Sequence, residues 1–114
     1  TQHYPKKLLP LGVETETITS SPDGLKGMVT ELLPDHIDWA GQVFVCGPMP
    51  MYVDMYRRRQ ELLKGKPAQI SLEVRMGCGL GICYGCTVKT RNGLRQVCRD
   101  GPVFDLDDIL WDEL

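Results

Sequence analysis

The sequence predicts an α/β fold followed by a small β-rich module. An almost wholly apolar run at residues 42–46 follows one strand-like and one helix-like segment, which is the order of a βαβ unit with parallel strands. Further along, a glycine- and cysteine-rich stretch contains Asn92-Gly93, the strongest short-range signal for a β-hairpin. A short linker at residues 64–67 separates the two patterns. We therefore expect two units, residues 1–66 and residues 67–114.

The first unit is expected to alternate strands and helices. Threonine and isoleucine favour a strand at residues 14–19. Apolar residues at helical spacing predict a helix over residues 27–33 that ends at Pro34. The run at residues 42–46 predicts a strand that is buried on both faces. Residues 50–63 predict a second helix, which a glycine and a proline close.

The second unit is expected to start with a strand at residues 68–74, where apolar and polar residues alternate. The segments at residues 87–90 and 94–98 predict the two strands of the hairpin. Residues 105–114 predict a short amphipathic helix that begins with an aspartate. We expect the apolar side of this helix to cover the small module rather than to bind a partner.

Four cysteines gather in the second unit: Cys78, Cys83, Cys86 and Cys98. A C-x4-C-x2-C spacing with a distant fourth cysteine is that of plant-type ferredoxins, in which four thiolates hold two irons. The interleaved glycines allow positive φ angles and let backbone N–H groups approach the sulfurs. The second strand of the hairpin returns Cys98 to the neighbourhood of Cys86. The pattern therefore predicts that these four thiolates bind a 2Fe–2S cluster.

Three other roles for the four cysteines stay open. They could hold a structural zinc ion, although zinc sites usually pair their ligands as C-x2-C twice and only one such pair is present. Disulfides are disfavoured because the loop is short and rich in glycine. The cysteines could also be unrelated buried residues.

A turn of Cys46, Gly47 and Pro48 follows the apolar strand directly. In parallel α/β sheets, ligands bind outside the carboxyl ends of the strands, and the N-terminus of the next helix favours an anion. The turn is therefore a candidate ligand site. The alternative is a plain strand-to-helix turn in which Cys46 is a small buried residue. The basic run at residues 57–59 is interpreted as a solvated helix face.

Composition excludes several classes of partner. The 114 residues carry a formal net charge of −2, which gives no general attraction to nucleic acid or to an anionic membrane. No window approaches the roughly 18 consecutive apolar residues of a membrane span. Four of the five cysteines fall in one cluster-type arrangement, which suits a reducing cytosol. We expect a cytoplasmic protein, and no residue of the chain is assigned a catalytic role.

Two motifs together resemble a known family. The segment at residues 43–51, V-F-V-C-G-P-M-P-M, resembles the nucleotide-binding motif near the end of the ferredoxin reductase-type NAD domain. The cysteine segment and the R-D-G-P-V-F-D that follows resemble the iron–sulfur module of the electron-transfer subunit of class 1B dihydroorotate dehydrogenase. Residues 23–33 fit that family too, so the resemblance runs from about Gly12 to Trp111. Flavin subunits of sulfhydrogenases and NADH-dependent ferredoxin:NADP oxidoreductases share the cysteine motif and are the alternative assignment.

The resemblance implies an electron relay in pyrimidine biosynthesis. In this family dihydroorotate is oxidised at FMN in a separate catalytic subunit, and electrons cross a 2Fe–2S cluster to FAD and then NAD. A heterotetramer with the FMN-containing subunit is expected. By resemblance the four cysteines of the second unit are the cluster ligands. Cys46, Gly47 and Pro48 line the nicotinamide and flavin side of the nucleotide site, so Cys46 is not a cluster ligand.

The chain also departs from the family pattern. The flavin-binding β-barrel and the glycine-rich phosphate loop of the NAD domain have no counterpart in the sequence. We therefore expect the C-terminal half of a ferredoxin reductase-type NAD domain, followed by the 2Fe–2S module, as a fragment of a longer subunit. Such a fragment is not expected to bind FAD by itself or to be active alone. A zinc-stabilised interaction module is the alternative from another functional class.

Overall fold

The computed structural model describes most of the chain after its N-terminal part, namely residues 12–14, 16, 18 and 28–113. The strand expected at residues 14–19 therefore falls partly outside the described residues. The start of the helix expected at residues 27–33 falls outside them as well. None of the helices in the described part is long and apolar enough to cross a membrane.

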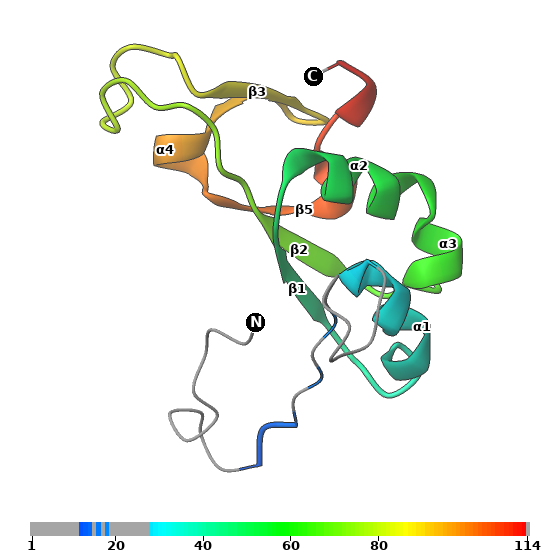
Figure 1. Cartoon of the computed structure of the whole chain (residues 1–114). Coiled ribbons are helices and arrows are strands. Elements are labelled where there is room, and N and C mark those ends of the chain that lie inside the picture. Colours follow the sequence, from blue (N-terminus) through cyan, green and yellow to red (C-terminus); the bar gives the residue numbers. More distant parts are fainter. Residues whose placement is uncertain (1–11, 15, 17, 19–27, 114) are drawn as a thin grey trace.

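A three-stranded sheet lies at the centre of the described part (Figure 1). Its middle strand is β2 (Ala68–Ser71), which runs parallel to β1 (Val43–Cys46) and antiparallel to β5 (Val103–Asp105). Ile70 on β2 lies beside Val45 on one side and Phe104 on the other. The strand predicted at residues 42–46 is thus confirmed, and in the described part of the chain its parallel partner is β2, which follows it in the sequence.

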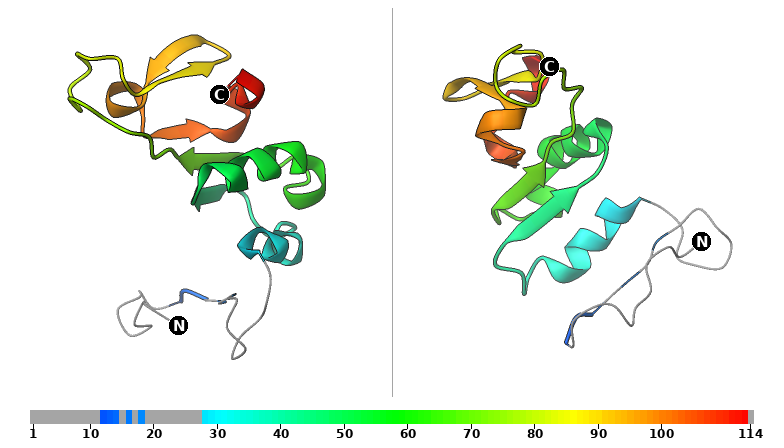
Figure 2. Two further views of the ribbon diagram at one scale, coloured as in Figure 1. Left: turned by 45° about the horizontal axis from the view of Figure 1, so that its top comes forward. Right: turned by 90° about the vertical axis from the view of Figure 1, so that its left-hand side faces the viewer.

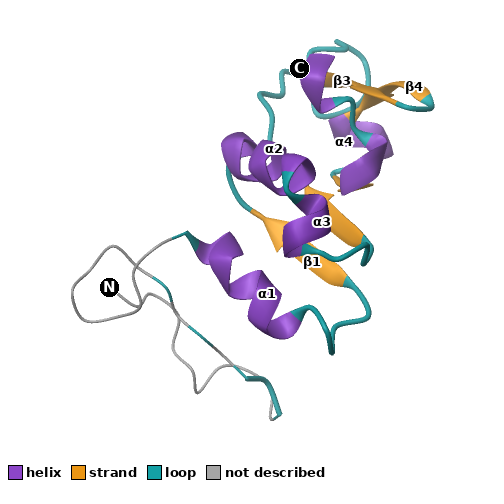
Figure 3. Ribbon diagram, turned by 90° about the vertical axis from the view of Figure 1, so that its right-hand side faces the viewer, coloured by secondary structure: helices purple, strands orange, loops and turns teal. Residues whose placement is uncertain are grey.

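Two helices between β1 and β2 cover one face of the sheet (Figure 3). They are α2 (Met49–Arg57) and α3 (Arg59–Leu62). Their inward side chains join those of the sheet in a core whose fully buried members are Tyr52, Ile37, Met55, Leu62, Ile70, Leu72, Ile109 and Val97. Burial of this apolar surface is the main force that holds the helices on the sheet.

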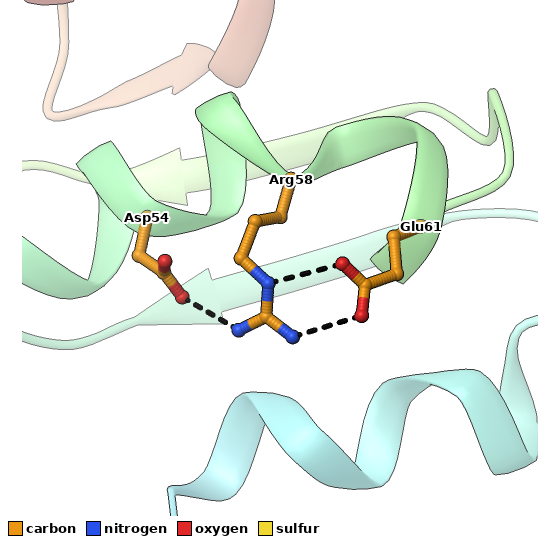
Figure 4. A network of polar contacts seen from close by, with 3 residues as sticks. All are labelled: Asp54, Arg58 and Glu61. Carbon is orange, nitrogen blue, oxygen red and sulfur yellow. Dashed lines mark hydrogen bonds and ion pairs between the residues drawn. The ribbon is translucent and has the colours of Figure 1, made fainter.

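The single helix predicted at residues 50–63 is interrupted at Arg58, whose φ and ψ are −104° and 21°. Just before the break, the Tyr56 carbonyl accepts a hydrogen bond of 2.7 Å from Arg59 Nη1, which competes with the helical ladder. Arg58 itself bridges the break, because its guanidinium contacts Asp54 at 3.1 Å and Glu61 at 3.1 and 3.2 Å (Figure 4). Glu61 is exposed, whereas Arg58 and Asp54 are half-buried, so the basic run at residues 57–59 is solvated only in part. The guanidinium lowers the pKa of Glu61.

The helix before β1 differs from its prediction. A 3₁₀ helix at Val29–Leu32 leads directly into α1 (Leu33–His36), so Pro34 lies in the first turn of α1 and does not end the helix. Proline is tolerated there because first-turn N–H groups have no partner within a helix. α1 packs near α3 at one end of the sheet (Figure 3).

The predicted hairpin is present in the second unit. β3 (Thr87–Thr90) pairs antiparallel with β4 (Gly93–Gln96). Gly93 takes a positive φ of 97° at the turn, a conformation that glycine adopts without steric cost. Thr90 Oγ1 donates to the Gly93 carbonyl at 2.7 Å and accepts from the Asn92 backbone N–H at 3.1 Å. The Asn-Gly signal therefore located the turn correctly.

The helix predicted over residues 105–114 is wrong. Two 3₁₀ helices, Leu106–Asp108 and Trp111–Glu113, flank Ile109, which is extended and forms an isolated bridge with Thr90. Backbone hydrogen bonds from Leu110 to Lys89 and from Arg91 to Asp108 tie this segment to the hairpin in place of a helical ladder. The apolar residues Leu106, Ile109 and Trp111 are nevertheless buried, as the amphipathic pattern required.

Burial on both faces of β1 is also a wrong prediction for the described part of the chain. Phe44 is 73% exposed and Cys46 is exposed, whereas Val43 and Val45 pack against the core. The described residues supply helices to one face of the sheet only, so the alternate side chains of β1 face outward. The sheet also crosses the boundary expected between residues 66 and 67, since β1 precedes that boundary and β2 and β5 follow it.

Candidate metal centre and nucleotide turn

The first three candidate cysteines lie in a loop between β2 and β3 that projects away from the sheet (Figures 1 and 2). The loop turns through three positive φ angles: Gly79 at 68°, Gly81 at 81° and Tyr84 at 61°. Two of these positions are glycines, as the sequence predicted, and the third is a tyrosine that the sequence did not indicate. The Tyr84 carbonyl accepts from Thr87 Oγ1 at 2.7 Å, which helps to fix the end of the loop at β3.

Cys78 Sγ lies within hydrogen-bonding distance of three backbone N–H groups. They belong to Leu80 at 3.3 Å, Ile82 at 3.3 Å and Cys83 at 3.4 Å. These donors favour the thiolate and lower the pKa of Cys78 to about 6. The fold thus prepares an anionic sulfur at this position, because the thiolate is the form that binds metal.

The other three sulfurs sit beside backbone amides or beside one another. Cys83 Sγ accepts from the Gly85 N–H, and Cys86 Sγ accepts from the Cys98 N–H, each at 3.4 Å. The pKa of Cys86 is lowered, mainly by the Cys98 amide. The pKa of Cys98 is raised, first by its hydrogen bond with the Cys86 thiol and then by burial. None of the five cysteines, all of which are described, is in a disulfide.

Cys98 lies in α4 (Val97–Asp100) rather than on the second hairpin strand, which is a correction to the sequence prediction. The strand ends at Gln96, and the Asp100 carboxylate accepts the Gln96 backbone N–H at 2.8 Å, so the chain turns into a short helix at that point. The expected return to Cys86 is confirmed, because the Val97 N–H donates to the Cys86 carbonyl at 3.2 Å.

The donor set fits an iron–sulfur cluster. Four unbridged thiols are available, and amide N–H groups directed at sulfur are the contacts that tune such clusters. Among the described residues, no three His, Cys, Asp or Glu side chains gather as ligands of a single metal ion. A dinuclear cluster has a different requirement, because four thiolates are shared between two irons.

The candidate nucleotide turn lies at the carboxyl end of β1. Cys46 is exposed there and lies outside the loop and helix that carry the other four cysteines. A Cβ added at Gly47 would meet the flexible end of the Met51 side chain, so this side chain of α2 lies directly against the turn. Pro48 precedes the first residue of α2 in an extended conformation, with φ and ψ of −73° and 156°.

Two polar side chains that the sequence analysis did not single out hold these segments. The Tyr52 hydroxyl accepts the Gly47 N–H at 2.9 Å and donates to the Ser71 carbonyl, so it joins the ends of β1 and β2. Gln96 Nε2 donates to the Gly81 carbonyl at 3.1 Å. Neither role has a sequence signal, because each depends on partners that only the fold brings close.

A known family of protein domains matches the second unit. Residues 73–110 match the model of the iron–sulfur cluster binding domain of dihydroorotate dehydrogenase B. Over these residues the chain is similar to that domain. The match covers the loop, the hairpin and α4, and so contains all four candidate ligands.

Curated relatives extend this similarity across most of the chain. An electron transfer subunit homolog from Aquifex aeolicus is 43% identical over 89 residues, which cover 76% of this chain and 33% of that protein. The electron transfer subunit of Caldanaerobacter subterraneus subsp. tengcongensis is 38% identical over 107 residues, covering 89% of this chain and 42% of that protein. The chain thus spans between 33% and 42% of the length of these relatives, which fits the expectation that it corresponds to part of a longer subunit.

A solved structure supports the fold. The structure of an NADH-dependent reduced ferredoxin-NADP oxidoreductase, described in connection with flavin-based electron bifurcation, aligns with a TM-score of 0.65 and 30% sequence identity. The alignment covers 80% of this chain and 33% of that chain. The described part of the chain is therefore an α/β module of the kind found in that oxidoreductase.

Proposed function

We propose that this chain is the electron-relay part of a dihydroorotate dehydrogenase B electron transfer subunit, which acts in pyrimidine biosynthesis. The observation that carries the proposal is the set of four free thiols, three of them facing backbone amides, within the segment that matches the iron–sulfur domain. The names of the curated relatives support the assignment to electron transfer.

The proposed cluster ligands are Cys78, Cys83, Cys86 and Cys98. A bound 2Fe–2S cluster would supply one-electron transfer between two flavins. The chain's own contribution is electrostatic. The three amides around Cys78 Sγ stabilise negative charge on that sulfur, and the Cys98 amide does the same for Cys86.

We further propose that Cys46, Gly47 and Pro48 line the nucleotide site of the complete subunit. In this proposal residues 1–66 contribute the C-terminal half of a ferredoxin reductase-type NAD domain, and residues 67–114 form the 2Fe–2S module. FAD and NAD would bind to the full-length subunit, and the partner would be the FMN-containing catalytic subunit in a heterotetramer. A cytoplasmic location follows from the need for reduced thiols.

A second assignment has one specific observation in its favour. The structural similarity to an NADH-dependent ferredoxin-NADP oxidoreductase fits a flavin and iron–sulfur subunit of that enzyme class or of a sulfhydrogenase. Both assignments use the same cluster ligands, and the partner subunit that co-purifies distinguishes them. A zinc-stabilised interaction module is the remaining alternative, and metal analysis distinguishes it from both.

The test is metal and spectroscopic analysis of the full-length subunit after anaerobic purification. We expect about two irons and two acid-labile sulfides per chain, with broad visible absorbance of the ferredoxin kind. A Cys83→Ser variant should lose this absorbance, whereas the matched Cys46→Ser variant should keep it. Stoichiometric zinc without iron, or unchanged absorbance in the Cys83→Ser protein, would contradict the proposed cluster.

A further inference from the structure

Gln96 is a buried polar residue at the junction of the segments that carry the four candidate ligands. Only 8% of its surface is exposed. It ends β4, it precedes the first residue of the helix that carries Cys98, and it pairs across the hairpin with Thr87, the residue after Cys86. Its backbone N–H is held by the Asp100 carboxylate at 2.8 Å, so its main chain is fixed independently of its side chain.

The Gln96 side chain extends from the end of β4 to the cysteine loop. Nε2 donates to the Gly81 carbonyl at 3.1 Å, a contact between residues 15 positions apart in the sequence. Gly81 itself has a positive φ of 81°, and a Cβ added there would lie 3.0 Å from Arg99 Cδ and 3.3 Å from Gln96 Oε1. The loop therefore rests directly on the side chains of Gln96 and Arg99.

This contact has a consequence at the sulfurs. The backbone amides on either side of Gly81, those of Leu80 and Ile82, each donate to Cys78 Sγ at 3.3 Å. The Gly81 carbonyl between them is the acceptor for Gln96. A carboxamide that holds this carbonyl therefore restrains the middle of the loop, between Cys78 and Cys83, against the helix that carries Cys98.

We propose that Gln96 is a positioning residue for the cluster site, which sets the placement of the Gly81 segment relative to Cys98 through the carboxamide contact with the Gly81 carbonyl. The inference rests on the proposed function, because it assumes that the four cysteines hold a cluster. Hydrogen bonds to cluster sulfurs stabilise the reduced cluster, so loosening the Leu80 and Ile82 amides should make the reduction potential more negative. It should also open the loop and speed the loss of the cluster.

The test compares three variants of the full-length subunit. Gln96→Met keeps the length of the side chain and removes the amide. Gln96→Glu keeps the shape but leaves an acceptor facing the Gly81 carbonyl. Gln69→Met is the matched control, because within the described part of the chain the Gln69 side chain on β2 donates only to the exposed Asp105 carboxylate, at 3.3 Å. The readouts are iron content, the rate of cluster loss in chelator, and the reduction potential from a mediated spectroscopic titration.

We expect both Gln96 variants to bind the cluster and to lose it about fivefold faster than wild type, the factor that matches one lost hydrogen bond. The reduction potential of Gln96→Met should be more negative, and Gln69→Met should behave as wild type. The potential is interpreted from the methionine variant, since the glutamate also adds charge.

Each other outcome overturns the inference in a recognisable way. If wild type holds iron and sulfide but Gln96→Met retains its potential and loss rate, the inference is wrong and the proposed function stands. If wild type holds no iron–sulfur cluster, both are wrong. If Gln96→Met does not fold, Gln96→Glu decides, and a folded glutamate variant with the wild-type loss rate refutes the inference.

Discussion

Replacing Tyr52 by phenylalanine removes one oxygen atom from the point where the two parallel strands end. Tyr52 is fully buried, and its hydroxyl both accepts the Gly47 N–H and donates to the Ser71 carbonyl. The phenylalanine ring fills nearly the same volume, so packing against Trp111, at 5.9 Å between ring centroids, should persist. The substitution therefore isolates the two hydrogen bonds.

The expected loss of stability follows from those two partners. Leaving a buried donor or acceptor unpaired costs about 1–3 kcal/mol, and the two affected groups are only partly buried, so we expect a total of about 2 kcal/mol. The free energy of unfolding, measured by urea titration with unchanged slope, should fall by this amount.

Tyr56→Phe is the matched control for this experiment. Tyr56 lies on the same helix with its ring 4.2 Å from the Arg59 guanidinium, and its hydroxyl has no hydrogen bond within the described part of the chain. Its substitution should change the free energy of unfolding by less than about 0.5 kcal/mol. Equal effects of the two substitutions would refute the idea that the Tyr52 hydroxyl joins β1 and β2.

Four further measurements extend this reasoning. Burial raises the pKa of Tyr52 above its ordinary value of 10.0, so its contribution to stability is complete below pH 10 and is lost as the pH rises further. Above pH 10, the free energy of unfolding should therefore fall more steeply with pH in wild type than in Tyr52→Phe. Trp111→Phe removes the hydrogen bond of 2.8 Å from Nε1 to the Leu106 carbonyl together with buried surface, and should lower the free energy of unfolding by about 2 kcal/mol in urea titration. Arg58→Met should leave the urea midpoint nearly unchanged, because both ion pairs of Arg58 are accessible to solvent and therefore screened. Gly81→Ala should reduce iron content per chain, since a Cβ at a φ of 81° strains the cysteine loop.

The sequence located the elements whose signal is local. The apolar run that became β1 needed only hydrophobicity, and the hairpin turn needed only a glycine at a positive φ after Asn92. The cysteine spacing likewise located the loop in which backbone amides face Cys78, because the glycines between the cysteines make such a loop possible.

Errors arose where long-range contacts overrode a local pattern. Residues 105–114 have the apolar spacing of a helix, but Ile109 is extended and forms a β-bridge with Thr90 of the hairpin, so the helix does not form. Cys98 lies on a helix because the Asp100 carboxylate accepts a hydrogen bond from the Gln96 backbone N–H at the end of β4. Burial of both faces of β1 was inferred from its apolar composition. Composition does not show which segment covers each face, and no described segment covers the face that carries Phe44.

The geometry between the two candidate sites is set by strand register rather than by a linker. Cys46 and Ser71 are register partners at the carboxyl ends of parallel strands, so the chain leaves the sheet at the same edge twice. From β1 it enters the candidate nucleotide turn, and from β2 it continues into the cysteine loop. The Tyr52 hydroxyl is hydrogen-bonded to the backbone at both of these points.

The division into two units between residues 66 and 67 stays a prediction. One sheet spans that boundary, so the packing of the sheet sets the distance between the turn and the loop. If β2 slipped by one residue, its outward side chains would turn toward the core and the cysteine loop would move with the strand. Ile70 opposes such a slip because it is fully buried between Val45 and Phe104. Ile70 therefore helps to position the cysteine sulfurs, although it is not in contact with them.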